Sequence, residues 1–315
     1  MRPVVSPPVR RNASMKPDET VRYDRSQQEW DQVLSDPDRQ RVGQSWLRDD
    51  TLDYWRHARI RGPLKTFVDH DPSGTWLTIG DGRYGTDAHH LLALGAKSVH
   101  CTDISDTLLK IGHDHGFIQA YSAENAEALS FADHAFDYVY CKESFHHFPR
   151  PYRALGEMFR VCRKAVILTE PRDRVVDRAR WSSLQRLLKW LLRKDRQQHY
   201  FEPVGNYIYS VSEREIEKFM LGMHYTRVAF LGSNDAYVAG VEFSPLASSS
   251  PADRQLRSKV QGRIRLLDTL TRLGLIESTL LSAALFKTAP APGLAEAMAR
   301  QGWTLKHLPK NPYIS

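Results

Sequence analysis

The stretch "TIGDGRYGTD", residues 78–87, decides the fold. Three closely spaced glycines lie between the apolar run "TWLTI" and the helical pattern "TDAHHLLALGA". Such a turn lets a ligand approach the backbone without meeting a side chain. Asp103 ends the next strand-like run, about 20 residues downstream, where a carboxylate can accept hydrogen bonds from both ribose hydroxyls. These positions predict a nucleotide-binding loop.

Around this loop, strand-like and helix-like segments alternate along the chain. Alternation of this kind indicates a parallel sheet covered by helices on both faces. Strands are expected at 75–80, 98–104, 136–143 and 164–170, and helices at 86–96, 106–116 and 152–163. Further on, Ser212 and Glu215 form a capping-box pattern at the start of a helix. The pattern of residues 226–243 favours an antiparallel hairpin.

The composition limits what the protein can be. Its 315 residues contain 41% apolar and 26% charged residues, which is ordinary for a soluble domain. A net charge of +7 permits an anionic partner, although the basic residues are scattered along the chain. Three cysteines without metal-ligand spacing favour reduced thiols, and no apolar run reaches the roughly 20 residues of a membrane span. We therefore expect a cytoplasmic protein without a signal peptide or a transmembrane segment.

The segments outside the alternating region divide the chain further. We expect a helical N-terminal cap whose best helix, at 49–68, begins at Asp49 or Asp50 as the N-cap residue. We also expect an amphipathic C-terminal segment at 257–286 that forms one or two helices. The predicted organisation is a disordered tail at 1–20, a helical cap at 21–74, the main domain at 75–245 with an insertion at about 172–211, and a helical C-terminal extension at 246–315.

A dehydrogenase is the first alternative, because the glycine spacing also fits a dinucleotide fingerprint. Tyr138 and Lys142 even form a Tyr-x-x-x-Lys pattern. The segment that contains them alternates like a strand, however, and four residues along a strand separate two side chains by about 13 Å. A proton relay cannot cross that gap, so the match is accidental.

The chain resembles the class I S-adenosylmethionine-dependent methyltransferases, in particular the small-molecule branch that includes quinone-biosynthesis enzymes. The resemblance covers residues 76–243 and rests on "WLTIGDGRYGTDA", "CTDIS", "AENAEALSFADHAFDYVYCKESFHHF" and "EMFRVCRKAVILTEP", in this order. It implies a doubly wound, mostly parallel seven-stranded α/β sheet with an antiparallel C-terminal strand, and S-adenosylmethionine as the cofactor.

The resemblance also implies roles for individual residues. The loop backbone would approach the methionine and ribose parts of the cofactor, Asp103 the ribose, Ile104 one face of the adenine, and Asn125 the adenine amino group. Thr78 departs from the acidic residue usual in the family, and the last glycine of the loop comes one residue late. The predicted cofactor-binding residues are Gly80, Asp81, Gly82, Gly85, Asp103, Ile104, Asn125, Ala126 and Lys142.

Methyl transfer to oxygen needs an aligned nucleophile and usually a base. His146 and His147 follow the fourth strand at the ligand-binding edge of the sheet, and a histidine titrates near neutral pH. We predict His147, His146 and Glu143 as the catalytic candidates, with packing of a helix or a hydrogen bond to the cofactor as their alternative roles. His89, His90, His113 and His115 lack the geometry of a shared site, so no metal is expected.

The acceptor must be selected by segments outside the common frame. Residues 184–194 read as an amphipathic basic helix, either packed on the sheet, closing as a lid or lying on anionic lipid. We expect a small metabolite or a glycan or natural-product precursor as the acceptor. "CKESFHHF" lacks the Pro-Pro-aromatic run of amino-directed base methylases, which argues against nucleic acid. An RNA 2′-O-methyltransferase and a catalytically inactive cofactor-binding module remain as alternatives, and the sequence leaves peripheral membrane contact and homo-oligomerisation open.

Overall fold

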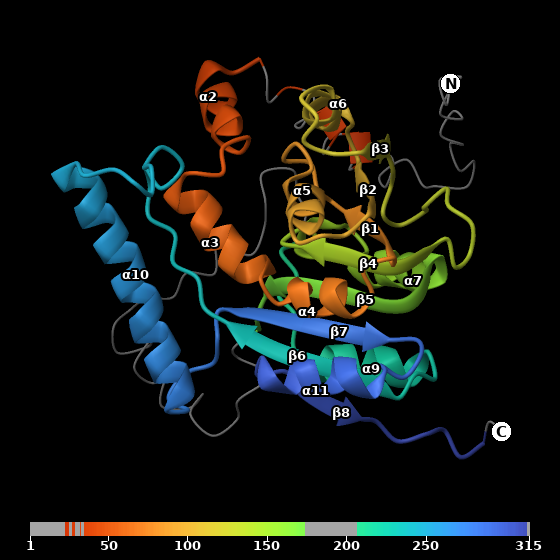
Figure 1. The fold of residues 1–315 in the computed structure, drawn as a ribbon. Helices are drawn as coiled ribbons and strands as arrows, with labels where there is room; N and C mark the ends of the chain where they lie inside the picture. Colours follow the sequence, from red (N-terminus) through yellow and green to blue (C-terminus); the bar gives the residue numbers. More distant parts are fainter. Residues whose placement is uncertain (1–22, 25–26, 29–31, 33–34, 174–206, 314–315) are drawn as a thin grey trace.

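The computed structural model describes residues 23–24, 27–28, 32, 35–173 and 207–313. Its centre is an eight-stranded sheet with the order β3-β2-β1-β4-β5-β7-β6-β8 (Figure 1). The first five of these strands are parallel, whereas β7 runs antiparallel to β5 and β6, and β8 runs antiparallel to β6. The strands are β1 (Thr75–Ile79), β2 (Ser98–Asp103), β3 (Ala120–Ala123), β4 (Phe136–Lys142), β5 (Cys162–Pro171), β6 (Arg227–Ser233), β7 (Leu280–Phe286) and β8 (Thr304–His307).

Helices cover both faces of this sheet, as the alternation predicts. One core cluster joins the sheet to α7 and α9, and a second joins it to α4, α5 and α11. The predicted doubly wound, mostly parallel α/β fold is confirmed. The helices are α2 (Pro37–Ser45), α3 (Leu52–Arg61), α4 (Leu64–His70), α5 (Thr86–Ala93), α6 (Thr107–Asp114), the 3₁₀ turn η1 (Phe145–His147), α7 (Pro151–Val161), α9 (Glu213–Gly222), α10 (Pro251–Arg272) and α11 (Pro292–Arg300).

The C-terminal region corrects the predicted helical extension at 246–315. Only its first part is the long helix α10. Residues 280–286 form β7, an inner strand of the sheet between β5 and β6, and residues 304–307 form the edge strand β8. All seven residues of β7 are buried, so "LLSAALF" shows no alternation of apolar and polar positions. An apolar run of this kind is easily mistaken for a helix face, and the sheet has eight strands rather than seven.

The predicted hairpin at 226–243 is also wrong. Its first arm is β6, but this strand pairs with β7 and β8, both from much later in the chain. Residues 234–243 are not a strand. Val241 is fully buried and packs against Leu52, and the turn as a whole contributes residues to the cavity described below.

At the N-terminus, the expected single helix is two helices. Thr51, not Asp49 or Asp50, caps α3, because its side chain accepts a hydrogen bond from the Tyr54 N–H at 3.1 Å. The break falls at Gly62 and Pro63, after which α4 packs into the core of the sheet. The predicted boundaries at 75 and 245 therefore cut through a common core. The predicted tail at 1–20 and most of the insertion, including residues 184–194, lie outside the described residues.

Candidate cofactor and acceptor site

The glycine loop leaves β1 and leads directly into α5. Gly80 and Gly85 have φ angles of +71° and +75°, a region that disfavours residues with a Cβ atom. At Gly82, a Cβ atom would come within 2.8 Å of Asp103 Oδ2. The loop therefore passes the end of β2 at a distance that only glycine permits. Gly80 and Gly82 line the cavity, whereas Gly85 sits at the N-cap of α5.

Asp81 fixes the loop from inside. Its carboxylate accepts hydrogen bonds from the N–H groups of Asp87 (3.0 Å) and Ala88 (2.9 Å) at the start of α5. The Thr78 hydroxyl donates a third, at 3.0 Å. At the position of Thr78, the methyltransferase family that the chain resembles usually has an acidic residue. Here Thr78 instead donates a hydrogen bond to the Asp81 carboxylate, so the loop forms without that acidic residue. Because the Asp81 side chain holds its own loop, a contact to a ligand would come from its backbone.

Asp103 ends β2 beside this loop. The Ser105 N–H donates to Asp103 Oδ1 at 3.3 Å, and the backbone N–H groups of Gly82 and Ile104 also face the carboxylate. Burial raises the pKa of Asp103 to about 6, against the opposing effect of these N–H groups. Among the described residues, its donors are backbone groups alone. The arrangement suits a ligand that brings hydroxyl donors, such as a ribose diol.

The other predicted cofactor contacts gather in one place. Ile104 and Ala126 line the same cavity, whose volume is about 920 Å³. Asn125 Oδ1 accepts a hydrogen bond from the Glu127 N–H at 2.9 Å, which fixes the turn after β3. Known ligand pockets measure about 300–1,000 Å³, so the cavity can hold a nucleoside cofactor together with a small acceptor.

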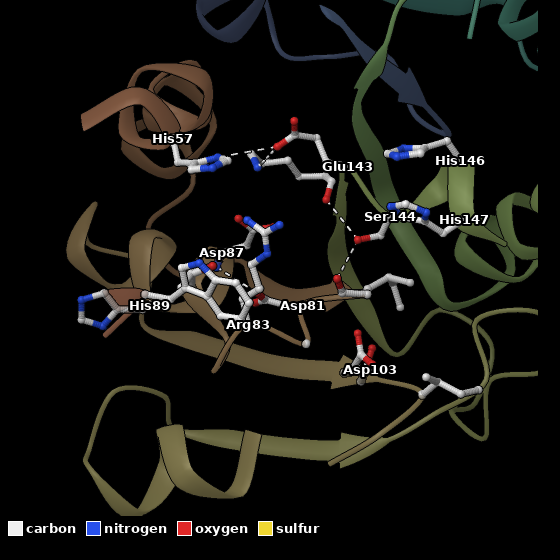
Figure 2. Close-up of a pocket in the computed structure, with 18 of the residues that line it drawn as sticks. His57, Asp81, Arg83, Asp87, His89, Asp103, Glu143, Ser144, His146 and His147 are labelled. Carbon is white, nitrogen blue, oxygen red and sulfur yellow. Dashed lines mark hydrogen bonds and ion pairs between the residues drawn. The ribbon is translucent and has the colours of Figure 1, made fainter. Parts of the chain in front are cut away.

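At the end of β4, three consecutive residues connect the loop to the rest of the cavity (Figure 2). The Lys142 ammonium pairs with the Glu143 carboxylate. Although burial alone would raise the pKa of Glu143, Lys142 and the nearby Arg83 lower it to about 2. The Ser144 hydroxyl donates to the Gly80 carbonyl at 2.6 Å and so ties β4 to the glycine loop. Tyr138 and Lys142 both lie on β4, which rules out the dehydrogenase relay.

His146 lies on η1, immediately after these residues. Its Nδ1 is 2.6 Å from Glu170 Oε2, and Glu170 is fully buried at the end of β5. The other carboxylate oxygen accepts the N–H groups of Ser144 and Phe145, both at 3.0 Å. One buried carboxylate therefore fixes both the turn and the histidine. Glu170 was not among the predicted site residues, although an acidic residue that ends the buried run "AVILT" is a signal for it.

His147 differs from its neighbour. Its side chain is exposed, although it also borders the cavity, and its ring lies 3.9 Å from the His146 ring, centroid to centroid. His146, by contrast, is buried and is held by the buried Glu170 carboxylate.

The opposite wall of the cavity comes from α3 and the turn after β6. Arg56 pairs with Asp53 at 2.7 Å and forms a bidentate pair with Asp235. The Arg56 guanidinium stacks over the Tyr237 ring, with Arg56 Cζ 5.4 Å from the ring centroid. Glu242 and His57 complete this side. We call these residues the α3 wall. The sequence predicts that α3 is helical but does not predict the wall.

His57 reaches the end of β4, where it lies beside Glu143 (Figure 2). Its Nδ1 lies 3.6 Å from Glu143 Oε2, and its Nε2 lies 3.7 Å from Asp53 Oδ1. Burial, together with the nearby cations Lys142 and Arg61, lowers the pKa of His57 well below its usual value. A neutral imidazole at this place can donate or accept a hydrogen bond.

Comparison with known proteins gives one family match. Residues 77–169 match the family described as "Methyltransferase domain". This stretch runs from β1 through β5 and so contains the glycine loop, Asp103 and the two histidines. No curated protein matches the chain in sequence.

Solved structures match at low similarity. A SAM-dependent methyltransferase from Thermotoga maritima has 16% identity over 75% of this chain and 95% of its own, with a TM-score of 0.42. Magnesium protoporphyrin IX methyltransferase from Synechocystis, with bound SAH, has 12% identity over 85% and 98%, with a TM-score of 0.44. A SAM-dependent methyltransferase from Archaeoglobus fulgidus has 12% identity over 72% and 93%, with a TM-score of 0.44.

The domain match and the site define the class of the protein. The chain contains a methyltransferase domain at residues 77–169, in agreement with the predicted S-adenosylmethionine-dependent enzyme. In the part of the chain that the structure describes, no helix is both long enough and apolar enough to cross a bilayer.

Proposed function

We propose that the protein transfers a methyl group from S-adenosylmethionine to an oxygen of a small molecule. The observation that carries this proposal is the His146–Glu170 pair at the cavity that the glycine loop borders. A histidine whose Nδ1–H is held by a buried carboxylate is oriented to take a proton on Nε2, and the carboxylate stabilises the imidazolium that forms. Proton removal is what distinguishes methylation of a hydroxyl from simple displacement.

The residues present fit the cofactor. The close approach of Gly82 to Asp103 forms a cradle that a side chain would fill, and the Asp103 carboxylate can accept the two ribose hydroxyls. Ile104 and Ala126 offer apolar contact to the adenine, and the Lys142–Glu143 pair lies where the methionine part would end. When bound, the cofactor supplies a methyl group on a sulfonium, which needs no further activation.

The acceptor would lie between His146 and the α3 wall. The predicted base His147 is exposed, so we assign the base to His146 and the positioning of that base to Glu170. The wall presents a neutral imidazole, paired charges and the Tyr237 ring, which suits a polar acceptor of metabolite or glycan-precursor size. We retain the cytoplasmic, small-molecule, quinone-biosynthesis-like assignment as part of this proposal.

The test is turnover with labelled S-adenosylmethionine on metabolite extracts, followed by kinetics on the acceptor found. We expect His146→Gln to lower kcat by about 10²–10⁴-fold, the range typical of a general base. The affinity for S-adenosylhomocysteine should stay unchanged. His147→Gln is the matched control and should keep most of the activity. Full turnover by His146→Gln would overturn the assignment of the base.

Glu170 acts through His146, so its test needs another readout. Glu170→Gln should lower kcat and move the acidic limb of the pH profile of kcat/KM to lower pH, because the carboxylate favours protonated His146. Glu170→Asp should restore part of the activity. An unshifted pH profile would mean that Glu170 only holds the turn after β4. Cofactor binding without turnover on any acceptor would favour the inactive module instead.

A further inference from the structure

Helix α10 lies at one edge of the molecule, beside α3 (Figure 1). Its inner face is the part that is packed: Val260 and Ile264 are buried against Leu52 and Val241. Residues beside this stripe, such as Leu256, are partly buried, and the opposite face of the 22-residue helix is exposed. A long helix with so narrow a buried stripe leaves most of its surface to solvent or to a partner.

The outer face of α10 exposes leucines. Leu266 is 59% exposed, Leu273 at the C-cap of the helix is 66% exposed, and Leu275, just after the helix end, is 48% exposed. At about 100° per residue, Leu266 and Leu273 lie within about 20° of each other and point away from Val260 and Ile264. Large apolar side chains with this much exposure, aligned on one helix face, are available for contact with an apolar phase.

Cations lie on both sides of these leucines. At helical spacing, one flank carries Arg254, Arg265 and Arg272 and the other carries Lys259 and Arg263, and all five residues are exposed. The two carboxylates of α10 are turned toward the body of the protein instead. Asp253 accepts a hydrogen bond from the Ser248 hydroxyl at 2.5 Å, and Asp268 accepts one from the Asn234 amide at 2.9 Å. Within the described chain, the outer face of α10 is therefore cationic.

We propose that this face of α10 docks on the surface of an anionic lipid bilayer. Aligned leucines can enter the headgroup region, while flanking arginines and lysines reach the lipid phosphates with their long side chains. A nucleic acid would use the cations but not the leucines. A second copy of the same face would bring like charges together. The pattern thus favours anionic lipid, and this inference does not depend on the proposed methyl acceptor.

Docking through α10 would place the α3 wall close to the bilayer. The Asn234 amide donates to Asp268 and, at 3.2 Å, to Thr271, both on α10. The turn that begins at Asn234 carries Tyr237 and Glu242, which line the cavity. The same helix therefore presents a cationic face outward and fixes part of the cavity wall inward.

The test is co-sedimentation of the full chain with vesicles of phosphatidylglycerol and phosphatidylcholine in equal parts, compared with pure phosphatidylcholine. We expect binding to the anionic vesicles that weakens with added salt, and little binding to the neutral ones. Leu266→Asp with Leu273→Asp should weaken binding by about tenfold or more. Arg263→Gln with Arg265→Gln should weaken it by about fivefold for each charge removed.

Matched controls separate α10 from the rest of the surface. Met223→Asp removes another exposed apolar side chain, and Arg214→Gln with Arg300→Gln removes two exposed cations elsewhere. These controls should bind vesicles like the natural chain, and all variants should keep its circular dichroism spectrum. Equal binding by the α10 variants and the natural chain would overturn the proposal. A dimer that forms without lipid and that the leucine substitutions dissociate would also overturn it. RNA binding that the leucine substitutions leave unchanged would overturn it as well.

Discussion

The two sides of the cavity differ in how far apart along the chain their residues lie. The cofactor side is formed largely by residues 78–104, within one strand–loop–helix–strand unit. The α3 wall depends on Arg56 and Asp235, which are 179 positions apart. The first side is a local structure with a recognisable spacing, whereas the second forms only when distant segments meet. We therefore expect changes in the wall to affect stability and acceptor binding, and changes in the loop to affect cofactor binding.

The largest effect is expected from Arg56→Gln. Asp53 and Asp235 would then remain as mostly buried carboxylates without their shared cation. Breaking a buried ion pair in this way costs about 3–5 kcal/mol. Urea denaturation should show this loss in the free energy of unfolding. The folded fraction should still bind S-adenosylhomocysteine, because the wall is distinct from the glycine loop.

An exposed ion pair is the control for this variant. Lys65 and Asp69 pair at 2.5 Å with both side chains 56% exposed, and Lys65→Met should cost about 1 kcal/mol at most. If Arg56→Gln were no more destabilising than Lys65→Met, the α3 wall would not depend on its ion pairs. Loss of cofactor affinity in the folded Arg56 variant would show that the two sides are not independent.

The next largest effect is expected on the cofactor side, from Asp103→Ala. This substitution removes the carboxylate that is proposed to accept two ribose hydroxyls. Two hydrogen bonds to a charged group contribute about 1.5–3 kcal/mol each, so the affinity for S-adenosylhomocysteine should fall by about 100-fold or more. Titration calorimetry measures this directly. Asp106→Ala, at the exposed start of α6, is the matched control, and an unchanged affinity in Asp103→Ala would remove the proposed ribose contact.

The same contrast explains what the sequence could predict. The glycine loop, Asp103 and the capping box at Ser212 and Glu215 are local patterns, and the structure shows each element where the spacing puts it. β7 could not be recognised, because a strand covered on both faces carries no period-two signal. Its place between β5 and β6 depends on partners far away in the sequence.

The candidate site divides in the same way. The sequence placed His146 at the ligand-binding edge but could not distinguish it from His147, since the difference is the hydrogen bond to Glu170 on the neighbouring strand. The α3 wall could not be predicted either, because it also depends on a contact between residues far apart in the sequence. Arg56 and Asp235 are ordinary surface residue types until the fold buries them together.

A smaller effect on the cofactor side should appear with pH. Burial raises the pKa of Asp103 to about 6, and only the ionised carboxylate accepts both ribose hydroxyls. Below pH 6 the ligand must therefore displace a proton, so its affinity should rise as the pH rises to about 6 and then level off. Between pH 7 and pH 5 the expected fall is about tenfold.

Calorimetry in buffers of different ionisation enthalpy measures the proton released. In Asp103→Asn this release and the pH dependence should both disappear, whatever affinity remains. A slope that persists in the Asn variant would assign the titration to another buried group, such as Asp81, whose pKa burial and the neighbouring Asp87 raise to about 7.

The smallest effect compares the N-caps of two helices. The Thr51 side chain caps α3 by accepting one hydrogen bond. The Ser212 hydroxyl caps α9 by accepting from the Glu215 N–H at 3.2 Å, and it also donates to Glu215 Oε2 at 2.9 Å. Replacing either by Ala should cost about 1 kcal/mol in the free energy of unfolding. Only Thr51→Ala should also raise the KM for the acceptor, because α3 carries the wall and α9 packs elsewhere on the sheet. An equal rise in both variants would mean that acceptor binding follows overall stability, and the wall would lose its separate role.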